Sequence, residues 1–302
     1  MKEYVLSYYP KFSCINGECK HSCCAGWQIN IDGDTLDFYA NQEKFRKQLN
    51  KGINFRKGKF KLKNKRCAFL RDDGLCDLII NLGEDALCQV CSDHPRFRSF
   101  FSDRMEVGIG FTCEEATRII LSSTDKITLI KTFDDGENKP LDFTEQKILE
   151  FREAFIALIQ DRNLSIKERI EKAIKLSNGD FYKDFNRIKK LFLSFESVDK
   201  TFKKSIKKLT DFNKEINEDL SVYFEHFLVN FAYRHFSTAF DTFEVRAISI
   251  SGIISLMLIN TLLTSTKVEE VAELFRTYST EVEYSNKNLT KLYAFSKKFI
   301  KI

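Results

Sequence analysis

The chain has 302 residues, of which 43% are hydrophobic and 30% are charged. This length suffices for one large domain or two smaller ones, and the composition is ordinary for a globular protein. Its 48 basic and 43 acidic residues leave a formal net charge of +5. This mixed charge lacks the strongly basic character of nucleic-acid-binding domains, so we expect no nucleic-acid partner.

With only three prolines, the chain favours helices over a turn-rich β-sandwich. The first ten residues contain no apolar run long enough for a signal peptide, so we expect a cytoplasmic protein, in which disulfides are rare. The most apolar stretch, residues 247–263, is interrupted by serines and is slightly short for a membrane span. We expect it to be a buried core helix, and we expect no membrane association.

Residues 1–125 are predicted to form a small, irregular α+β module in which turn signals separate short elements. The expected elements are a strand at 29–32, a helix at 35–49, a hairpin at 54–63 that turns near Lys57 and Gly58, a helix at 77–82 that ends at Gly83, a hairpin made of 97–101 and 105–111, and a helix at 113–122.

Residues 134–140 are polar, contain glycine and proline, and are predicted to be a linker. Beyond it, residues 140–302 are predicted to be all helical. Thr144 is expected to cap a helix that runs to about Arg162, and Ser165 and Glu168 have the spacing of a capping box. Further helices are expected at 180–195, 199–212, 215–240 and 245–263, with two more at the C-terminus. The predicted fold class is mainly α: a small irregular α+β cysteine-rich module followed by an all-helical bundle.

All nine cysteines lie between residues 14 and 113, and Cys14, Cys19, Cys23 and Cys24 fall within one short stretch. Such a cluster of thiols is unfavourable in a reducing cell unless a soft metal takes the thiolates. The odd number of cysteines also argues against a complete disulfide framework. We therefore predict that the module binds a metal ion or an iron–sulfur cluster; the alternative is a set of buried structural thiols.

The spacing of the cysteines narrows the kind of site. Neighbouring side chains of an extended chain point in opposite directions, so Cys23 and Cys24 suggest two metal sites, or one cluster and a spare thiol. Cys19 and Cys23 fit the first gap of the Cys-x3-Cys-x2-Cys motif of enzymes that cleave S-adenosylmethionine into radicals, but Gly26 stands at the third position. Cys88 and Cys91 form the only Cys-x2-Cys pair of the sequence, which does not indicate a paired zinc ribbon.

An extended pattern surrounds the cysteines: Phe12-Ser-Cys14, Cys19, Cys23-Cys24-Ala-Gly-Trp27, Ile29-Asn-Ile31-Asp32, Thr35, Tyr39, Cys67-Ala-Phe-Leu70, Gly74-Leu-Cys76, Leu82-Gly-Glu84, Leu87, Cys91, Pro95-Arg96 and Cys113-Glu-Glu-Ala116. This pattern resembles that of the flagellin lysine N-methylase family, whose cysteine-rich part is similar to a wider group of zinc- or iron-chelating domains. In the helical half, residues 225–234 resemble a family segment more loosely.

The resemblance implies a set of eight metal ligands: Cys14, Cys19, Cys23, Cys24, Cys67, Cys76, Cys91 and Cys113. Cys88 stands where the family often has serine and is left out. The chain also departs from the family's usual Ser-Cys-Pro-Glu-Ala, because it reads Thr112-Cys113-Glu114-Glu115-Ala116.

By the same resemblance, we expect methyl transfer from S-adenosylmethionine to lysines of flagellin by a protein that carries an iron–sulfur cluster, expected to be of the 4Fe-4S type, with zinc as the alternative. No residue is marked as catalytic, and no glycine-rich dinucleotide-binding signature is present. On the helix expected at 215–240, Asn230 and Arg234 share a face and Tyr233 is adjacent. These three are candidates for cofactor binding, or else polar anchors of that helix. Two other functions remain open: a non-enzymatic zinc- or iron-binding interaction module, and a redox sensor.

Overall fold

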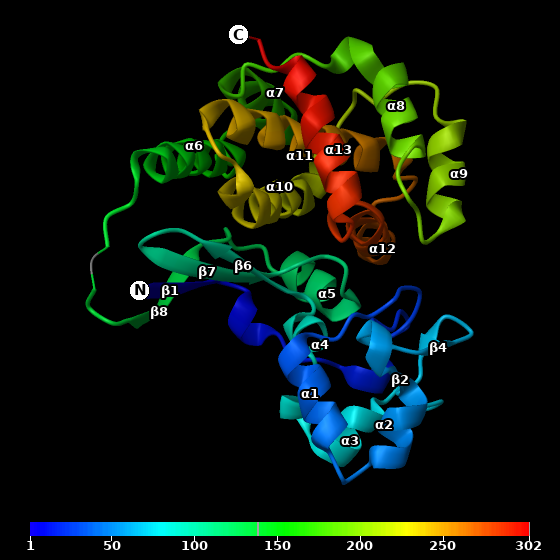
Figure 1. The fold of residues 1–302 in the computed structure, drawn as a ribbon. Helices are drawn as coiled ribbons and strands as arrows, with labels where there is room; N and C mark the ends of the chain where they lie inside the picture. The colour runs from blue at the N-terminus through cyan, green and yellow to red at the C-terminus, as the bar shows by residue number, and fades with distance from the viewer. Residues whose placement is uncertain (138, 302) are drawn as a thin grey trace. The chain divides into compact units, whose positions relative to one another are not determined.

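The computed structural model describes residues 1–137 and 139–301 (Figure 1). The chain divides into two compact units. The first, here called the helical unit, comprises Met1–Phe12, Phe97–Thr112 and Ala116–Ile302. The second, the cysteine-rich unit, comprises Ser13–Arg96 and Cys113–Glu115. The units therefore do not divide between residues 125 and 140, where the sequence placed the boundary.

A four-stranded sheet explains this difference. Its strands are β1 (Lys2–Leu6), β6 (Arg96–Phe100), β7 (Arg104–Ile109) and β8 (Leu129–Asp134), in the order β6-β7-β1-β8. β1 runs parallel to β7 and antiparallel to β8. In this sheet, β1 from the start of the predicted module and the β6–β7 hairpin from near its end pair with each other and with β8, which precedes the bundle. These segments therefore belong to the helical unit. The hairpin at 97–111 is confirmed, whereas β8 was not predicted.

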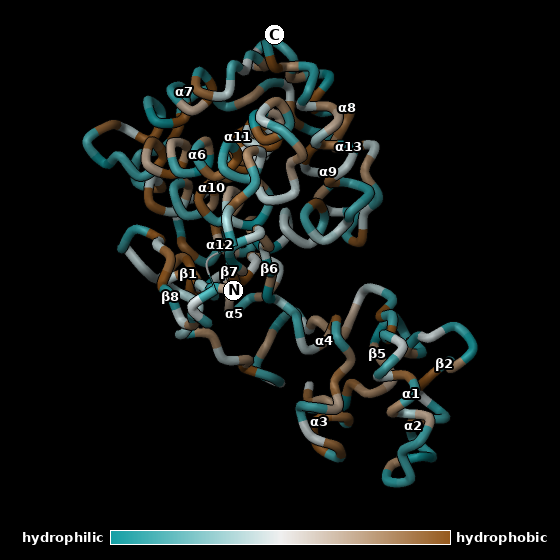
Figure 2. Tube along the Cα trace, turned by 60° about the vertical axis from the view of Figure 1, so that its left-hand side comes forward, coloured by the Kyte–Doolittle hydropathy of each residue, from teal (hydrophilic) through white to brown (hydrophobic). Residues whose placement is uncertain are grey.

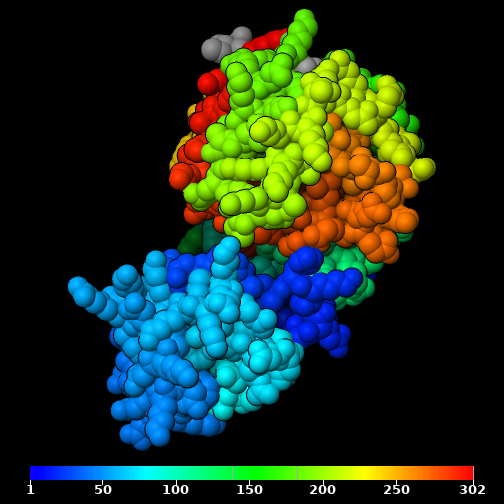
Figure 3. Space-filling view, turned by 90° about the vertical axis from the view of Figure 1, so that its right-hand side faces the viewer, coloured from blue at the N-terminus to red at the C-terminus, as the bar shows by residue number. Residues whose placement is uncertain are grey.

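The helices of the helical unit follow the predicted order (Figure 1). They are α5 (Glu114–Ser122), whose first two residues belong to the other unit, α6 (Phe143–Ile159), α7 (Ile166–Leu176), α8 (Phe185–Leu193), α9 (Lys200–Lys208), α10 (Ser221–His235), α11 (Thr242–Leu262), α12 (Val268–Tyr278) and α13 (Asn286–Ser296). In Figure 3, residues of α8 and α9 (yellow-green) and of α12 (orange) form the face of this unit that is turned to the viewer.

Local capping fixes where these helices begin. The capping box of Ser165 and Glu168 is present at α7, as predicted. At α6 the cap is Asp142, whose side chain accepts from the backbone N–H of Glu145, so the prediction of Thr144 was wrong by two positions. The predicted linker, residues 134–140, ends two positions before this cap, and its residue Asn138 lies outside the described residues.

The predicted core helix is confirmed as α11. Within the described part of the chain it is the one helix long and apolar enough to cross a membrane, and 83% of its most apolar window is buried inside the protein. Figure 2 shows hydrophobic residues along it. Ile253, Leu256 and Ile259 are at most 1% exposed, which is the burial that a core helix requires.

The cysteine-rich unit is built from short elements around a core of its own. They are α1 (Gly33–Asn41), α2 (Arg46–Gly52), β2 (Ile53–Asn54), β3 (Lys59–Phe60), β4 (Leu62–Lys63), β5 (Arg66–Cys67), α3 (Asp77–Leu82) and α4 (Gln89–Asp93). The core gathers Ile29, Tyr39, Leu49, Phe60 and Phe69, among others, with Cys67 and Cys88. Phe60 and Phe69 meet edge to face, with ring centroids 5.3 Å apart.

Two predictions in this unit were wrong in detail. The expected helix at 35–49 is split into α1 and α2, because Phe45 adopts a left-handed conformation with φ 70°. The expected strand at 29–32 is reduced to an isolated bridge between Asn30 and Lys59. The hairpin of β2 and β3 and the helix α3 are confirmed. The fold class is mainly α with a small α+β part, as the sequence predicted.

Candidate metal centre

All nine cysteines belong to the cysteine-rich unit, and all are free thiols. Eight of them fall into two neighbourhoods. We call Cys14, Cys19, Cys23 and Cys113 the exposed thiol group, because Cys14 and Cys23 are exposed and the other two are half-buried. We call Cys24, Cys67, Cys76 and Cys91 the buried thiol group, because Cys67 is buried and all four contribute to the core of the unit.

Glu114 brings the members of the exposed thiol group together. Its Oε2 atom accepts hydrogen bonds from the backbone N–H groups of Lys20 (2.9 Å) and His21 (3.3 Å). This fixes the loop that carries Cys19 and Cys23 beside Cys113, which directly precedes Glu114. Glu114 stands where the related family usually has proline, so here the residue after the cysteine carries a contact that proline could not make.

The thiols of the exposed group influence one another electrostatically. Partial burial and the thiolate charges of Cys113 and Cys14 raise the pKa of Cys19 to about 11. Charges on Cys14 and Cys113 also raise the pKa of Cys23, although the largest cause there is its hydrogen bond with Cys24. This repulsion between like charges disfavours the thiolate form, and a bound cation would reverse that effect.

Backbone hydrogen bonds build the buried thiol group. The N–H of Cys67 donates to the carbonyl oxygen of Cys24 (2.8 Å), and Leu70 forms a bridge with Cys76. The backbone N–H group of Phe69 lowers the pKa of Cys67, and those of Leu78 and Ile79 lower the pKa of Cys76, which partly offsets the larger effect of burial. Donors aimed at sulfur favour thiolates. Burial nevertheless raises the pKa of Cys67 to about 12, as expected for thiols without a counter-charge.

Cys23 and Cys24 link the two groups. The sequence predicted that their side chains point in opposite directions, as in an extended chain. The structure instead places both in a turn closed by a hydrogen bond from the N–H of Ala25 to the carbonyl of Ser22 (3.2 Å). Their thiols hydrogen-bond to each other, which lowers the pKa of Cys24 to about 7 and raises that of Cys23. The expectation of opposite directions was therefore wrong at this point.

Cys88 is the ninth cysteine and differs from the other eight. It is fully buried in the core of the unit, and its thiol donates to the carbonyl oxygen of Asn30 (3.9 Å). It also hydrogen-bonds to Cys91, and this bond and burial raise the pKa of Cys91. The Cys88 thiol already donates to a carbonyl oxygen, so its burial is explained without a bound metal.

In residues 1–137 and 139–301, no group of three or more His, Cys, Asp and Glu side chains is arranged to hold a metal ion. Two pairs of thiols hydrogen-bond to each other instead, Cys23 with Cys24 and Cys88 with Cys91. The donor set still fits a thiophilic metal in its chemistry, because each neighbourhood offers four sulfurs. Rotation about the Cα–Cβ bond redirects a cysteine sulfur without moving the backbone. The eight ligands remain predictions.

The three residues suggested for cofactor binding lie on α10 in the helical unit, where Asn230 and Tyr233 are buried and Arg234 is partly buried. The side-chain amide of Asn230 donates to the Tyr8 hydroxyl and to the carbonyl oxygen of Ile109 (3.0 Å). The ring of Tyr233 lies under the guanidinium of Arg152, whose carbon is 4.8 Å from the ring centroid. These contacts anchor α10 to β7 and α6.

Arg234 belongs to a buried ionic cluster that sequence reasoning missed. Its guanidinium approaches Glu283 (3.4 Å) and lies over the ring of Tyr284, while His235 contacts the other oxygen of Glu283 (2.9 Å). Burial alone would raise the pKa of Glu283, but the charge of Arg234 and the hydrogen bond of His235 lower it to about 2. Glu283 ends a π-helical turn, Ser279–Glu283, a feature common at functional sites. The signal in the sequence that could have indicated this cluster was the adjacent pair Arg234 and His235 in a largely apolar helix.

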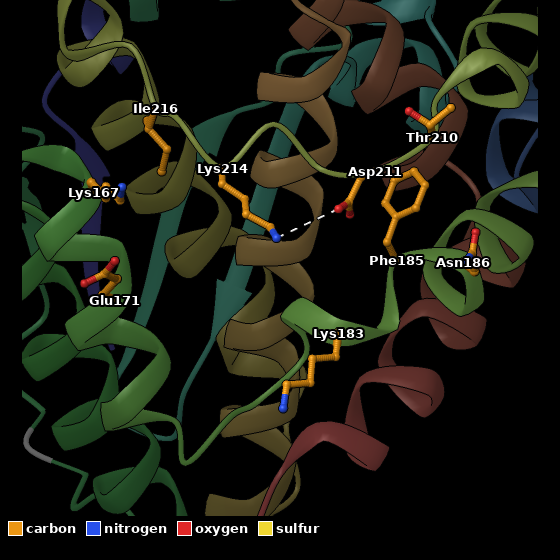
Figure 4. Close-up of a pocket in the computed structure, with 9 residues that line it drawn as sticks. All are labelled: Lys167, Glu171, Lys183, Phe185, Asn186, Thr210, Asp211, Lys214 and Ile216. Atoms are coloured by element: carbon orange, nitrogen blue, oxygen red, sulfur yellow. Dashed lines mark ion pairs between the residues drawn. The ribbon is translucent and has the colours of Figure 1, made fainter.

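Two pockets open on the helical unit. The larger, of about 700 Å³, is shown in Figure 4. It is lined by Lys167, Glu171, Lys183, Phe185, Asn186, Thr210, Asp211, Lys214 and Ile216. Lys214 and Asp211, which lie three positions apart in one segment of the lining, form an ion pair (3.9 Å). The smaller, of about 230 Å³, is lined in part by Tyr8, Lys126 and His226. In the described part of the chain, neither lining includes a cysteine or the three α10 candidates.

Comparisons with known proteins identify the family. The chain is 28% identical over 194 residues to the lysine-N-methylases of Salmonella typhimurium strain LT2 and Salmonella choleraesuis strain SC-B67, which is 58% of this chain and 47% of each relative. It is 30% identical over 162 residues to the flagellar biosynthetic protein FliU of Salmonella muenchen, which is 49% of this chain and 91% of that relative.

The chain spans about half the length of the lysine-N-methylases that it matches. No family model and no solved structure matches it. The similarity to FliU nevertheless covers nearly all of that protein, and the resemblance seen in the cysteine pattern is thereby confirmed. The chain belongs to the lysine-N-methylase family.

Proposed function

We propose that this chain is an S-adenosylmethionine-dependent protein lysine N-methyltransferase that acts on flagellin and carries an iron–sulfur cluster in its cysteine-rich unit. The observation that carries the proposal is the similarity to lysine-N-methylases and to a flagellar biosynthetic protein. The two neighbourhoods of four thiols support the metal part, because iron–sulfur clusters are held by cysteine thiolates.

The reaction needs no radical. The neutral Nζ atom of a lysine attacks the methyl carbon of the sulfonium, the carbon–sulfur bond breaks, and S-adenosylhomocysteine leaves with the electron pair. A proton is released from the amine. The protein must hold amine and methyl group in line, accept that proton and exclude water. A bound cluster would supply a Lewis-acidic iron for the amino and carboxylate groups of the cofactor, or serve as a scaffold.

Residues of this chain would contribute by positioning. The cysteines would hold the cluster, and Glu114 fixes the loop that carries two of them. In the helical unit, Asn230 and Arg234 are held by Tyr8, Ile109 and Glu283 rather than left mobile. Such preorganisation is what a binding site requires, and these residues remain our candidates for contacts with the cofactor.

Protein purified without air and incubated with radiolabelled S-adenosylmethionine and flagellin tests this proposal. We expect label in flagellin lysines, and we expect Cys23→Ser to abolish it. Cys88→Ser is the matched control, since it replaces a thiol of the same unit that is not a predicted ligand, and the serine hydroxyl can still donate to the carbonyl of Asn30. No transfer by protein replete with cluster would overturn the proposal.

A second candidate is a non-enzymatic metal-binding interaction module. It is favoured by the cysteines, because metal binding alone is sufficient to account for the eight predicted ligands. Calorimetry separates the two candidates. Saturable binding of S-adenosylmethionine supports the enzyme, whereas its absence in metal-replete protein supports the module.

A further inference from the structure

We propose that α9 binds an acidic segment of the protein substrate through the lysines on its outer side. This inference deepens the proposed function and rests on it for the identity of the partner. The surface in question, here called the lysine face, consists of Lys200, Lys203, Lys204, Lys207 and Lys208. Residues of α8 and α9 form the part of the helical unit that Figure 3 turns to the viewer.

The lysines of α9 are gathered on one side of the helix. Because successive residues of a helix are turned by about 100°, all five lysines lie opposite Phe202 and Ile206. Phe202 and Ile206 are at most 7% exposed, whereas four of the five lysines are exposed. Neither α9 nor the adjacent α8 contains an acidic residue, and together they carry eight basic side chains. The whole chain has a net charge of only +5, so its positive charge is concentrated here.

The stability of α9 does not explain these lysines. Lys200 begins the helix, where the helix dipole disfavours positive charge, and no acidic residue stands in the first turn. Lysines also lie four positions apart in three pairs, 200 with 204, 203 with 207 and 204 with 208, and such pairs of like charge destabilise a helix. Only Lys207 and Lys208, in the last turn, suit the dipole. A partner that neutralises the lysine face would remove this repulsion.

The protein itself does not neutralise the lysine face. Within residues 1–137 and 139–301, none of its five lysines forms an ion pair, and Lys203 alone hydrogen-bonds to a backbone carbonyl. The two acidic residues between α8 and α9 have other roles. Glu196 pairs with Lys287 (3.1 Å), and the side chain of Asp199 caps α9. The face therefore presents positive charge to solvent.

A pocket that is also rich in lysine lies where α9 ends. This pocket, of about 700 Å³, is bounded by the start of α8 and by the chain that follows α9 (Figure 4). Lys167, Lys183 and Lys214 reach its lining from three different segments, together with the carboxylates of Glu171 and Asp211. The opening is large enough for side chains of a bound segment, and its lysines outnumber its carboxylates.

The surroundings of the lysine face favour carboxylates over nucleic acids and lipids as ligands. Single-stranded nucleic acids stack their bases on aromatic rings, but Phe185, Phe192 and Phe202 of these helices are at most 7% exposed. Helices that lie on membranes insert an apolar side, and that side of α9 is buried in the protein. Arginine forks are typical of phosphate recognition, and the single arginine of the two helices, Arg187, is paired with Asp184 (2.6 Å). Because the proposed reaction takes place on a protein, an acidic segment of that protein is the ligand that fits.

Charge reversal on α9 tests the proposal. In Lys204→Glu/Lys207→Glu, all three four-residue pairs of lysines become pairs of opposite charge, so the thermal unfolding midpoint should be unchanged or higher. Methyl transfer to flagellin is measured at a series of flagellin and salt concentrations. We expect the KM for flagellin to rise about tenfold and to lose most of its salt dependence, while kcat is unchanged. The control Lys44→Glu/Lys47→Glu makes the same change of net charge at exposed positions of the cysteine-rich unit and should keep the KM of the unmodified protein.

A binding measurement separates this proposal from the proposed function. The anisotropy of a labelled polyglutamate peptide should report binding to the unmodified protein and to the control, and none to the α9 variant. Equal peptide affinity or an equal KM in the α9 variant would overturn the proposal. Tighter binding of single-stranded DNA or of phosphatidylserine vesicles than of the peptide would also overturn it. Absence of methyl transfer from every protein, with peptide binding lost in the α9 variant alone, would contradict the proposed function and leave the acid-binding face intact.

Discussion

The side chain of Glu114 accepts a hydrogen bond from the backbone N–H of Lys20 at 2.9 Å, although the two residues are 94 positions apart. This contact closes the loop of the exposed thiol group. We expect Glu114→Ala to lower the iron content of the purified protein several-fold, because the N–H groups of Lys20 and His21 lose the carboxylate oxygen that accepts from both of them. Glu114→Gln, which keeps an oxygen acceptor, should retain most of the iron. Equal iron in Glu114→Ala and the unmodified protein would show that the loop needs no such tether.

A buried ion pair holds the sheet to the bundle. Arg152 on α6 donates to both carboxylate oxygens of Glu106 on β7, at 2.6 and 2.8 Å, and both residues are at most 1% exposed. Removal of one partner leaves a buried charge uncompensated, so Glu106→Gln should lower the free energy of unfolding by about 3–5 kcal/mol. Chemical denaturation measures this change. The double variant Arg152→Met/Glu106→Leu should recover much of it; a further loss in the double variant would contradict the account.

The cluster of Arg234, His235 and Glu283 makes stability depend on pH. The pKa of Glu283 falls from 4.5 to about 2 on folding, so its contribution is present above pH 4.5 and is lost as pH falls toward 2. Burial lowers the pKa of His235 from 6.5, so the unfolded state binds its proton first and stability also falls below pH 6.5. Both effects have the same sign.

Denaturation at a series of pH values checks this expectation. In the unmodified protein, the free energy of unfolding should decrease from pH 7 downward. Glu283→Gln should be less stable at neutral pH and should lack the part of the decrease that lies below pH 4.5. Glu269→Gln, at an exposed position of α12, is the matched control and should follow the unmodified profile. An identical profile in Glu283→Gln would exclude this carboxylate as the source.

Substitution of Asn230 tests whether this residue only anchors α10 or also binds the cofactor. Asn230→Ala leaves the carbonyl of Ile109 and the hydroxyl of Tyr8 without their donor, and the free energy of unfolding should decrease by about 1–3 kcal/mol. A role in cofactor binding predicts in addition a weaker affinity for S-adenosylmethionine, measured by calorimetry under conditions where the variant is folded. Unchanged affinity in the folded variant would leave Asn230 as an anchor alone.

Much of the helical unit could be read from the sequence, because capping and apolar spacing are local. Ser165 and Glu168 specify the start of α7 within four residues, and α11 is apolar on all sides. The sheet could not be read, since β1 pairs with strands that begin about 100 and 130 residues later in the chain. Such pairing depends on tertiary packing that no local pattern records. Phe45 likewise adopts a positive φ that its residue type disfavours.

The candidate site was predictable in its chemistry and less so in its arrangement. The cysteines indicated a metal, and the adjacent Cys23 and Cys24 suggested more than one site. Which thiols would meet depends on contacts such as that of Glu114 with Lys20, which are invisible in the sequence. The buried ionic partner of Arg234 was equally hidden, because Glu283 lies 49 residues away.

Mass spectrometry of flagellin after incubation with the anaerobically purified protein and S-adenosylmethionine tests the central claim most directly. The account predicts the mass of one or more added methyl groups on flagellin lysines, with equimolar formation of S-adenosylhomocysteine, and no addition with Cys23→Ser. Unmodified flagellin, from protein shown to carry its cluster and to bind S-adenosylmethionine, would contradict it.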